Sequence, residues 1–373
     1  MKPRYAERRA RVSETLAGEG IAAALFEDTE GRRDPSIRYL CGHPGDALLV
    51  ISASGASRLV AWDVNMAAAM AEIDGVRAFG DFERLPERAL AAMLAELGVP
   101  AGSKVELPSS FGYTRYVRFV EILDGYDLVC RDDGIDARVA SLRSIKDAEE
   151  LALYRRAAAV TDALVERLEA AVRSGEAKTE LDVALLIERE SRAALCEGTG
   201  FETLAAGPTR SFGIHAFPPF GSGPFASEGM SILDFGLKLE GYTTDVTMTF
   251  LRGALGAERE RMVSLVLEAR EAALAMIAPG VKTRDVARKV DEVFARAGLS
   301  MPHALGHGIG LEAHEAPAIR SREDNEDVFA VGQVVALEPG LYHPELGGIR
   351  YEDDLIITAG GHEILTHSRI VRL

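Results

Sequence analysis

Two aspartates occupy positions where a charge is costly. Asp234 lies in the run ILDFG and Asp245 in GYTTDVTMTF, and both runs have the composition of β-strands. A carboxylate in an apolar strand is destabilising unless a cation compensates it. The two aspartates are 11 residues apart, which fits adjacent antiparallel strands joined by a turn near residues 239–241, so both carboxylates can reach one spot. Two such carboxylates repel each other unless a cation binds them or one is protonated.

Three histidines follow one another closely in the segment HALGHGIGLEAH. His303 and His307 are four residues apart, a spacing that on a helix would pair them as zinc ligands, but the neighbouring glycines indicate a loop that enters a strand. From Gly308 onward, strand alternation would point His314 toward the same cavity. A single histidine is commonly structural, whereas three in a glycine-rich segment favour a functional site.

Two glutamates complete the set of candidates. Glu338 follows an apolar strand run in VVALEPGLY, and Glu352 lies in the strand-like run GGIRYEDDLIIT. Either one alone could be an acid at a strand end that faces solvent. Glu352, Asp353 and Asp354 are consecutive, however, and one strand cannot project all three side chains to the same side. Simple solvent exposure therefore does not explain Glu352.

Four carboxylates and one imidazole together make a plausible ligand set for metal ions. The five residues are Asp234, Asp245, His307, Glu338 and Glu352. Oxygen ligands with one nitrogen suit Mn(II), Co(II), Fe(II) or Zn(II), whereas a structural zinc site would use cysteine. Two divalent cations would together carry the positive charge that neutralises the four carboxylates. The set therefore predicts a buried dinuclear centre.

The elements that carry these residues divide into two regions. Residues 1–143 alternate helix-like and strand-like runs, including a helix over 5–18 and strands over 21–26 and 47–52, which predicts an α/β domain with a partly parallel sheet. No glycine-rich phosphate loop follows these strands. Residues 144–373 begin in a long helical signal and then mix strands and helices without strict alternation, which predicts an α+β domain.

Composition restricts the classes of function. The chain has 373 residues and a formal net charge of -16, which repels phosphate backbones and anionic lipid, so neither nucleic acid nor a membrane is expected as a partner. No apolar run reaches the ~18 residues that span a bilayer, and the charged N-terminal sequence lacks the apolar stretch of a secretory signal. Three scattered cysteines fit a cytoplasmic protein.

Four motifs resemble, in order and spacing, those of the pita-bread metallopeptidases: GYTTDVTMTF, HALGHGIGLEAHE, LEPGLY and GIRYED. That family includes prolidase (Xaa-Pro dipeptidase), aminopeptidase P and methionine aminopeptidase. The segment SIRYLCGHPGDALLV resembles the N-terminal domain of prolidases, aminopeptidases P and creatinase. The resemblance implies a C-terminal pita-bread catalytic domain over residues 144–373, with an α+β fold, and a smaller α/β creatinase/prolidase-like N-terminal domain over residues 1–143.

The resemblance also implies a role for each candidate ligand. Asp234 would chelate one metal ion. Asp245 and Glu352 would bridge both ions. His307 and Glu338 would be terminal ligands.

Four further residues match positions around the family's metal site. His215, in SFGIHAF, and His314 match histidines that contact the scissile carbonyl and its oxyanion. Glu338 would in addition carry a proton during catalysis. His303 matches a histidine that lines the substrate pocket. Arg350 matches an arginine near the metal carboxylates, and we expect it to contribute to substrate binding.

The implied activity is hydrolysis of the peptide bond before proline, in dipeptides or at peptide N-termini, by a hydroxide that bridges two metal ions. Manganese, cobalt, zinc and iron are the candidate metals. The substrate would be a small peptide with proline at its second position, and the resemblance implies a homodimer.

Two other classes of function stay open. Relatives of this fold act on non-peptide small molecules, as hydrolases of ectoine-type solutes or as a lyase for a sulfonium compound. Others are binding modules without catalysis, and these typically lose metal ligands. Creatinase-like chemistry without metal is disfavoured because all five ligand positions are filled. Met248 bears on the substrate, since the family often has an arginine there, in D-x-T-R-T.

Overall fold

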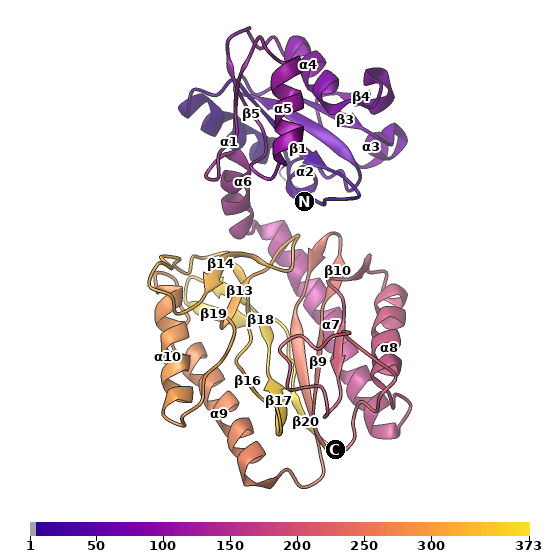
Figure 1. The fold of residues 1–373 in the computed structure, drawn as a ribbon, viewed down its shortest axis with the longest axis vertical. Helices are drawn as coiled ribbons and strands as arrows, with labels where there is room; N and C mark the ends of the chain where they lie inside the picture. The colour runs from indigo at the N-terminus through magenta and orange to yellow at the C-terminus, as the bar shows by residue number, and fades with distance from the viewer. Residues whose placement is uncertain (1–4) are drawn as a thin grey trace. The chain divides into compact units, whose positions relative to one another are not determined.

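The computed structural model describes residues 5–373 (Figure 1). The chain divides into two compact units, Met1–Arg143 and Ser144–Leu373. None of the described helices is long and apolar enough to cross a lipid bilayer.

One mixed sheet of six strands organises the N-terminal unit. Its strands are β1 (Ala23–Asp28), β2 (Ala47–Ser52), β3 (Ser57–Ala61), β4 (Val76–Ala78), β5 (Lys104–Glu106) and β6 (Asp127–Val129). They lie in the order β4-β3-β2-β1-β5-β6. β1 pairs antiparallel with β2 and parallel with β5, and β5 pairs parallel with β6. The sheet is therefore partly parallel, as the sequence predicts.

Short helices bury both faces of this sheet. They are α1 (Tyr5–Gly18), α2 (Ser36–Cys41), α3 (Val64–Met70), the 3-10 helix η1 (Phe79–Phe82), α4 (Pro86–Glu96), α5 (Tyr113–Ile122) and α6 (Ile135–Ser144). On one face, Met93 of α4 and Phe119 of α5 pack with Val50 and Val60 of the sheet, and all four side chains are buried. The helices α1 and α2 pack against β1 and β2. The central strands β1 and β2 are buried along their whole length and alternate their side chains between two packed layers.

The second unit opens with the long helix α7 (Ala148–Ser174). Asp147 caps it by accepting hydrogen bonds from the N–H groups of Glu149 and Glu150, at 2.9 and 3.0 Å, and Glu150 accepts one from the N–H of Asp147 at 2.8 Å. The sequence predicts a long helical run at the start of this domain, and we expect no break near its beginning. The structure instead ends α6 at Ser144 and begins α7 after Asp147, because the capping residue has extended backbone angles.

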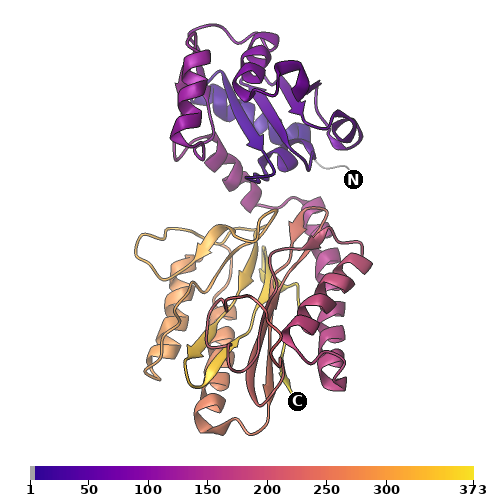
Figure 2. The ribbon, with the colours of Figure 1, turned by 45° about the vertical axis from the view of Figure 1, so that its right-hand side comes forward.

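Two helix pairs flank the strands of the second unit. The remaining helices are α8 (Glu180–Ala193), α9 (Gly256–Leu274) and α10 (Thr283–Ala295). Figures 1 and 2 show α7 and α8 on one side of the strands and α9 and α10 on the other. Val266 of α9 and Phe294 of α10 are buried with Val335, Leu337 and Leu355 in one apolar cluster. The helices therefore pack against the strands from both sides of this unit.

Four small sheets supply those strands. The first holds β7 (Gly198–Thr199), β10 (Leu237–Leu239) and β11 (Tyr242–Thr243). The second holds β8 (Leu204–Ala206), β9 (Gly229–Phe235), β12 (Val246–Arg252) and β20 (Ile370–Arg372). The third holds β13 (Gly306–Gly308), β14 (Glu315–Ile319), β15 (Val334–Leu337), β18 (Asp353–Thr358) and β19 (Gly361–Ile364), and the fourth β16 (Gly340–His343) and β17 (Gly347–Arg350).

The hairpin predicted around the two aspartates is confirmed. β9 pairs antiparallel with β12, with Asp234 opposite Thr247, and the hairpin continues through β10 and β11 to Leu239 opposite Tyr242. The chain turns at Glu240 and Gly241, which both have positive φ, 49° and 90°. Asp234 and Asp245 thus come to neighbouring positions on paired strands.

Gly236 allows the two strands of this hairpin to approach each other between the aspartates. A Cβ added there would lie 1.9 Å from the carbonyl oxygen of Thr244 and 2.8 Å from Phe201, closer than any real contact. The backbone would have to move to accept a side chain. Glycine is therefore required for the geometry of the hairpin.

We predict that Gly236→Ala destabilises the protein by about 3 kcal/mol, because overpacking at this point displaces backbone rather than a flexible side chain. The free energy of unfolding in urea would measure the change. Gly360→Ala is the matched control, since a Cβ at Gly360 meets nothing within 4 Å. Equal stability of the two variants would contradict the close approach at Gly236.

Candidate metal centre and active site

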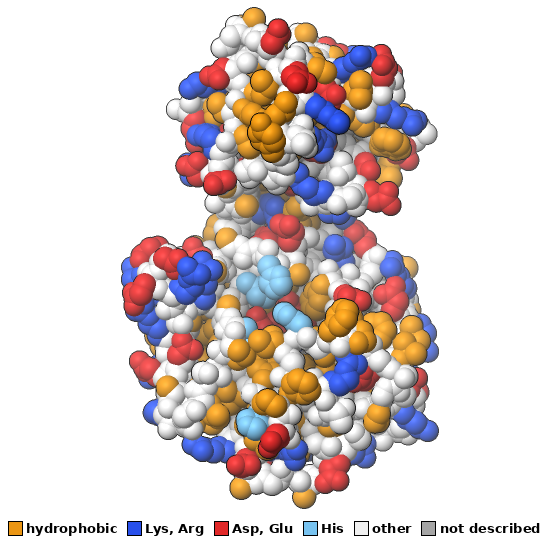
Figure 3. Space-filling view, in the orientation of Figure 1, with side chains coloured by type: hydrophobic (Ala, Val, Ile, Leu, Met, Phe, Trp, Pro, Cys, Tyr) orange, Lys and Arg blue, Asp and Glu red, His pale blue; other side chains and the backbone are white. Residues whose placement is uncertain are grey.

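A cavity of about 640 Å³ in the second unit brings the predicted site residues together. Eight of the nine line it: His215, Asp234, Asp245, His303, His307, His314, Glu338 and Glu352. Figure 3 shows histidine side chains gathered on this face of the unit, with acidic atoms between them. Arg350 is the ninth, and it does not line the cavity.

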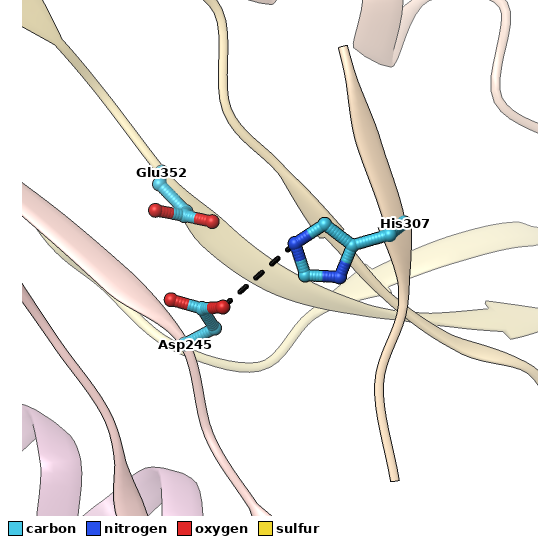
Figure 4. Close-up of side chains that lie close together, drawn as sticks. All are labelled: Asp245, His307 and Glu352. Carbon is cyan, nitrogen blue, oxygen red and sulfur yellow. Dashed lines mark ion pairs between the residues drawn. The ribbon is translucent and has the colours of Figure 1, made fainter. Parts of the chain in front are cut away.

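Asp245, His307 and Glu352 form the centre of the site. One ligand atom from each lies within 4.8 Å of the others, and Figure 4 shows the three side chains converging from three different segments of the chain. His307 Nε2 is 3.8 Å from Asp245 Oδ2 and 3.7 Å from Glu338 Oε1. This spacing leaves room between the side chains for a cation, because ligand atoms of one divalent ion lie farther apart than hydrogen-bonded atoms.

Paired backbone segments hold the two central carboxylates in place. Thr247 and Glu352 form an isolated antiparallel bridge, and the Thr247 hydroxyl donates a 2.6 Å hydrogen bond to Glu352 Oε2. The backbone N–H of Asp245 donates to Asp354 Oδ2 at 3.0 Å. The first contact joins β12 to the segment before β18, and the second joins the residue before β12 to β18 itself. The hairpin that carries Asp245 is thereby fixed against the strand that follows Glu352.

Arg350 lies behind the carboxylates and is 1% exposed. Its guanidinium donates to Asp234 Oδ2, to the Thr247 hydroxyl at 2.8 Å and to the Tyr342 hydroxyl at 2.9 Å. A further bond reaches the carbonyl oxygen of Ile214 at 3.2 Å. The structure thus places Arg350 near the carboxylates, where it orients Asp234. Its predicted part in substrate binding stays a prediction.

Glu338 and His303 occupy another wall of the cavity. Glu338 directly follows β15, and its backbone N–H donates to the carbonyl of Leu305 at 2.9 Å. His303 Nδ1 is 3.7 Å from Glu338 Oε2, and His303 Nε2 lies 3.1 Å from the Tyr342 hydroxyl. The solvent-facing interpretation of Glu338 is therefore excluded by its contacts.

His314 and His215 are exposed and face the cavity from loops. The ring of His314 lies 4.1 Å from that of His307, measured between centroids. The sequence argument for His314 used strand alternation from Gly308, and that reason is wrong. The strand β13 ends at Gly308, and residues 309–314 form an irregular turn before β14.

Burial raises the pKa of all four candidate carboxyl ligands. For Asp245 and Glu352, neighbouring carboxylates raise the pKa further, and both values lie well above the ordinary range. Burial also raises the pKa of Asp234, against the lowering effect of Arg350, and raises that of Glu338 to about 7. Burial and the neighbouring His314 lower the pKa of His307 to about 4, which leaves its imidazole neutral and able to bind a metal.

The donor set fits a divalent cation. Asp234 Oδ1 is buried and has no hydrogen-bond partner among residues 5–373, which is costly unless a ligand satisfies it. The close carboxylates can all ionise at neutral pH only if positive charge offsets their repulsion. A neutral imidazole and four carboxylates match a metal of the Mn(II), Co(II), Fe(II) or Zn(II) group.

Three supporting residues were missed by the sequence analysis: Thr247, Tyr342 and Asp354. Threonine in a strand and tyrosine near a turn are common, so neither stands out along the chain. Asp354 stood in the acidic run after Tyr351 but had no evident partner. Their hydrogen-bond partners lie far away in sequence, and only the folded structure shows them.

Comparison with known proteins agrees with this geometry. Residues 152–359 match the profile of metallopeptidase family M24. An uncharacterized peptidase of Staphylococcus saprophyticus is 33% identical over 251 residues, which is 66% of this chain and 69% of that protein. The X-Pro aminopeptidase structure from Thermotoga maritima superposes with a TM-score of 0.83 at 27% identity, covering 98% of this chain and 99% of that one. The Xaa-Pro dipeptidase structure from Bacillus anthracis gives 0.84 at 25% identity, with 99% and 100% covered.

Fold and site together define a metal-dependent peptidase with the pita-bread fold. The chain belongs to metallopeptidase family M24.

We predict that removal of metal by a chelator lowers the thermal unfolding midpoint, because the buried carboxylates then repel each other or must be protonated. Restoring Mn(II) at a hundredfold excess over its dissociation constant would stabilise the fold by about 2.7 kcal/mol. Calorimetry and elemental analysis of bound metal are the measurements.

The variant Asp245→Asn would bind less metal, and its unfolding midpoint would change less when metal is removed or added. Asp291→Asn, on the surface of α10, is the control and would behave as the unmodified protein. An unmodified protein with no bound metal and no response would contradict the assignment.

Proposed function

We propose that this protein hydrolyses the peptide bond before proline, using two divalent metal ions held by Asp234, Asp245, His307, Glu338 and Glu352. The observation that carries the proposal is the convergence of all five side chains on one cavity. Asp245 and Glu352 are the central pair and would bridge the ions. The likeness to an X-Pro aminopeptidase and an Xaa-Pro dipeptidase supports the choice of substrate.

The bound ions would supply a hydroxide nucleophile near neutral pH and polarise the scissile carbonyl. The protein's own residues would stabilise the developing negative charge, bind the amino group of the substrate and transfer a proton. His314 and His215, at the cavity surface, would donate hydrogen bonds to the oxygen that becomes negative during attack. Asp234 would face the amino group of the substrate.

Glu338 is suited to proton transfer. Its carboxyl group lines the cavity, with Oε1 3.7 Å from His307 Nε2 and Oε2 3.7 Å from His303 Nδ1, and a carboxylate at a reaction site can take up and release a proton. The nitrogen of an Xaa-Pro bond carries no hydrogen and must be protonated as proline leaves. Glu338 would carry that proton from the attacking water to the nitrogen.

Met248 does not alter the lining of the cavity. It lies in β12 next to Thr247, is fully buried, and is paired with Leu233 of β9. Successive residues of a strand point to opposite faces, so Thr247 faces the carboxylates and Met248 faces away from them. Methionine at this position, where the family often has an arginine, therefore leaves the proposed metal ligands and pocket residues in place.

The alternative substrates stay as outcomes of the test. A non-peptide small amide would use the same ligands, with the loops around His215 deciding the fit. A binding module without catalysis is disfavoured by the complete ligand set. The homodimer, the cytoplasmic location and the absence of nucleic-acid and membrane partners remain proposals from the sequence.

We predict that the protein with added Mn(II) or Co(II) cleaves Xaa-Pro dipeptides and leaves the corresponding Xaa-Ala dipeptides nearly intact, as measured by release of free amino acid. Glu352→Gln and Asp245→Asn would each lower kcat at least about 100-fold, because each removes a ligand expected to bridge the ions. Elemental analysis would give about two metal ions per chain in the unmodified protein. Full metal and full activity in both variants would overturn the dinuclear assignment. Cleavage of only non-peptide amides would overturn the proposed specificity for Xaa-Pro peptides.

Arg320 offers a way to separate dipeptidase from aminopeptidase activity. It is exposed, lines the cavity, and has no carboxylate within ion-pair distance among the described residues. It is also the only lysine or arginine among the lining residues of this described cavity. A guanidinium in that position can bind the C-terminal carboxylate of a short substrate.

We predict that Arg320→Ala raises KM for an Xaa-Pro dipeptide about tenfold, the effect of losing one charged hydrogen bond, and changes KM for a longer Xaa-Pro-Yaa peptide much less. Arg322→Ala is the matched control, because Arg322 is exposed, pairs with Asp324 and lies outside the cavity. Steady-state kinetics on both substrates is the measurement. An equal effect on the two peptides would exclude carboxylate binding by Arg320.

A further inference from the structure

A second cavity, of about 280 Å³, lies within the N-terminal unit. All of its lining residues belong to the segment 27–115, so the N-terminal unit forms it alone. Leu48 of β2 and Val60 of β3 give it an apolar wall, and both belong to the core face that α4 and α5 cover. The sheet therefore forms one wall of this cavity, and the cavity shares no lining residue with the metal centre.

Trp62 and Arg84 form a stacked pair at this cavity. Trp62 is the only tryptophan of the chain and is 56% exposed. The guanidinium carbon of Arg84 lies 4.7 Å from the centroid of its ring, and the ring of Phe79 lies 5.8 Å away. Among the described residues, no carboxylate forms an ion pair with Arg84. An arginine stacked in this way keeps its in-plane N–H groups free to bind a carboxylate.

The backbone that presents Arg84 is held in an unfavourable conformation. Glu83 and Arg84 both have positive φ, 55° and 58°, although neither is glycine. Hydrogen bonds from their N–H groups to the carbonyls of Gly80 and Phe79, each 3.2 Å, maintain the turn after η1. Residues in such conformations persist where the surrounding structure requires them, and they are concentrated at binding sites. The turn fixes Arg84 over Trp62.

Glu27 supplies a buried negative charge at the same cavity. Its side chain is 4% exposed, and Arg115 of α5 pairs with Oε1. Among residues 5–373, no group donates a hydrogen bond to Oε2. Burial raises the pKa of Glu27 in spite of Arg115, so a further cationic donor would stabilise the ionised carboxylate. An ammonium group meets this requirement.

The charges around the cavity select the class of ligand. Its acidic residues are Glu27, Asp28, Glu30 and Asp46, and its basic residues are Arg84 and Arg115. Arg33 pairs with both Asp28 and Asp46, at 3.3 and 2.7 Å. The excess of acid disfavours phosphates and other polyanions. Separate cationic and anionic groups beside an apolar wall favour a small zwitterion with an apolar side chain.

We propose that this cavity is a binding site for a free α-amino acid or a dipeptide with an apolar side chain. The ammonium group would bind Glu27, the carboxylate Arg84, and the side chain the wall formed by Trp62 and Leu48. The site is separate from the metal centre, and the proposal does not depend on the function proposed for that centre.

Titration with L-leucine tests the proposal, because the single tryptophan reports on this cavity. We expect a saturable change in Trp62 fluorescence, and the same dissociation constant by calorimetry. N-acetyl-L-leucine lacks the ammonium group and L-leucinamide lacks the carboxylate, so each would bind at least about tenfold more weakly. Leucine binding in Asp245→Asn would be unchanged, which separates this site from the metal centre.

Two variants and their controls complete the test. Glu27→Gln and Arg84→Gln would each weaken leucine binding about tenfold. Glu121→Gln and Arg118→Gln, exposed on α5 and outside the cavity, make the same charge changes and would bind normally. If Glu27→Gln does not fold, the exposed Arg84 still decides the question. No saturable binding, equal binding of N-acetyl-L-leucine, or loss of binding in Asp245→Asn would overturn the proposal.

Discussion

The repulsion among four buried carboxylates is the constraint on which the second unit depends. Asp234, Asp245, Glu338 and Glu352 share one cavity, and burial raises the pKa of each. An acid whose pKa is raised on folding costs stability at neutral pH, where it would be ionised in the unfolded chain. Among the described residues, Arg350 is the one cation buried beside them, and a single positive charge cannot offset four negative ones. Bound divalent metal ions would remove this cost, and the chemistry of the site and the stability of the fold would then depend on the same charges.

The same constraint explains how the backbone is organised around the site. The carboxylates come from segments more than 100 residues apart, as Asp234 and Glu352 illustrate. Such distant groups can be held at ligand distances only by rigid elements on both sides. Gly236 brings the strands of one hairpin together, and the bridge between Thr247 and Glu352 joins that hairpin to the next sheet. The outer helix pairs supply the apolar burial that supports these polar contacts.

The candidate ligands that share the cavity could be predicted from the sequence, whereas the residues that support them could not. Asp234 and Asp245 are conspicuous because a charge in an apolar strand needs an explanation, and the turn between them limits their pairing to one hairpin. Thr247 carries no comparable signal, since threonine is common in strands and its partners Glu352 and Arg350 are about a hundred residues away. His314 shows a further limit: the residue was identified although a turn, and not a strand, directs it to the cavity. The Trp62 cavity was not foreseen, because left-handed backbone at Arg84 has no mark in the sequence.

Substrate choice follows a different physical rule from metal binding. Metal ligands must supply a fixed total charge at fixed distances from the ion. Their residue types and their order along the chain are therefore restricted, and sequence motifs reveal them. The exposed side chains at the cavity include His215, His314 and the neighbouring Phe217, which lie on loops, so their positions depend on local turns. Met248, the one departure within the motifs, lies on the strand face turned away from the carboxylates. The residue that departs from the family pattern thus does not line the cavity, and our proposal therefore assigns selection among substrates to the loops and to Arg320.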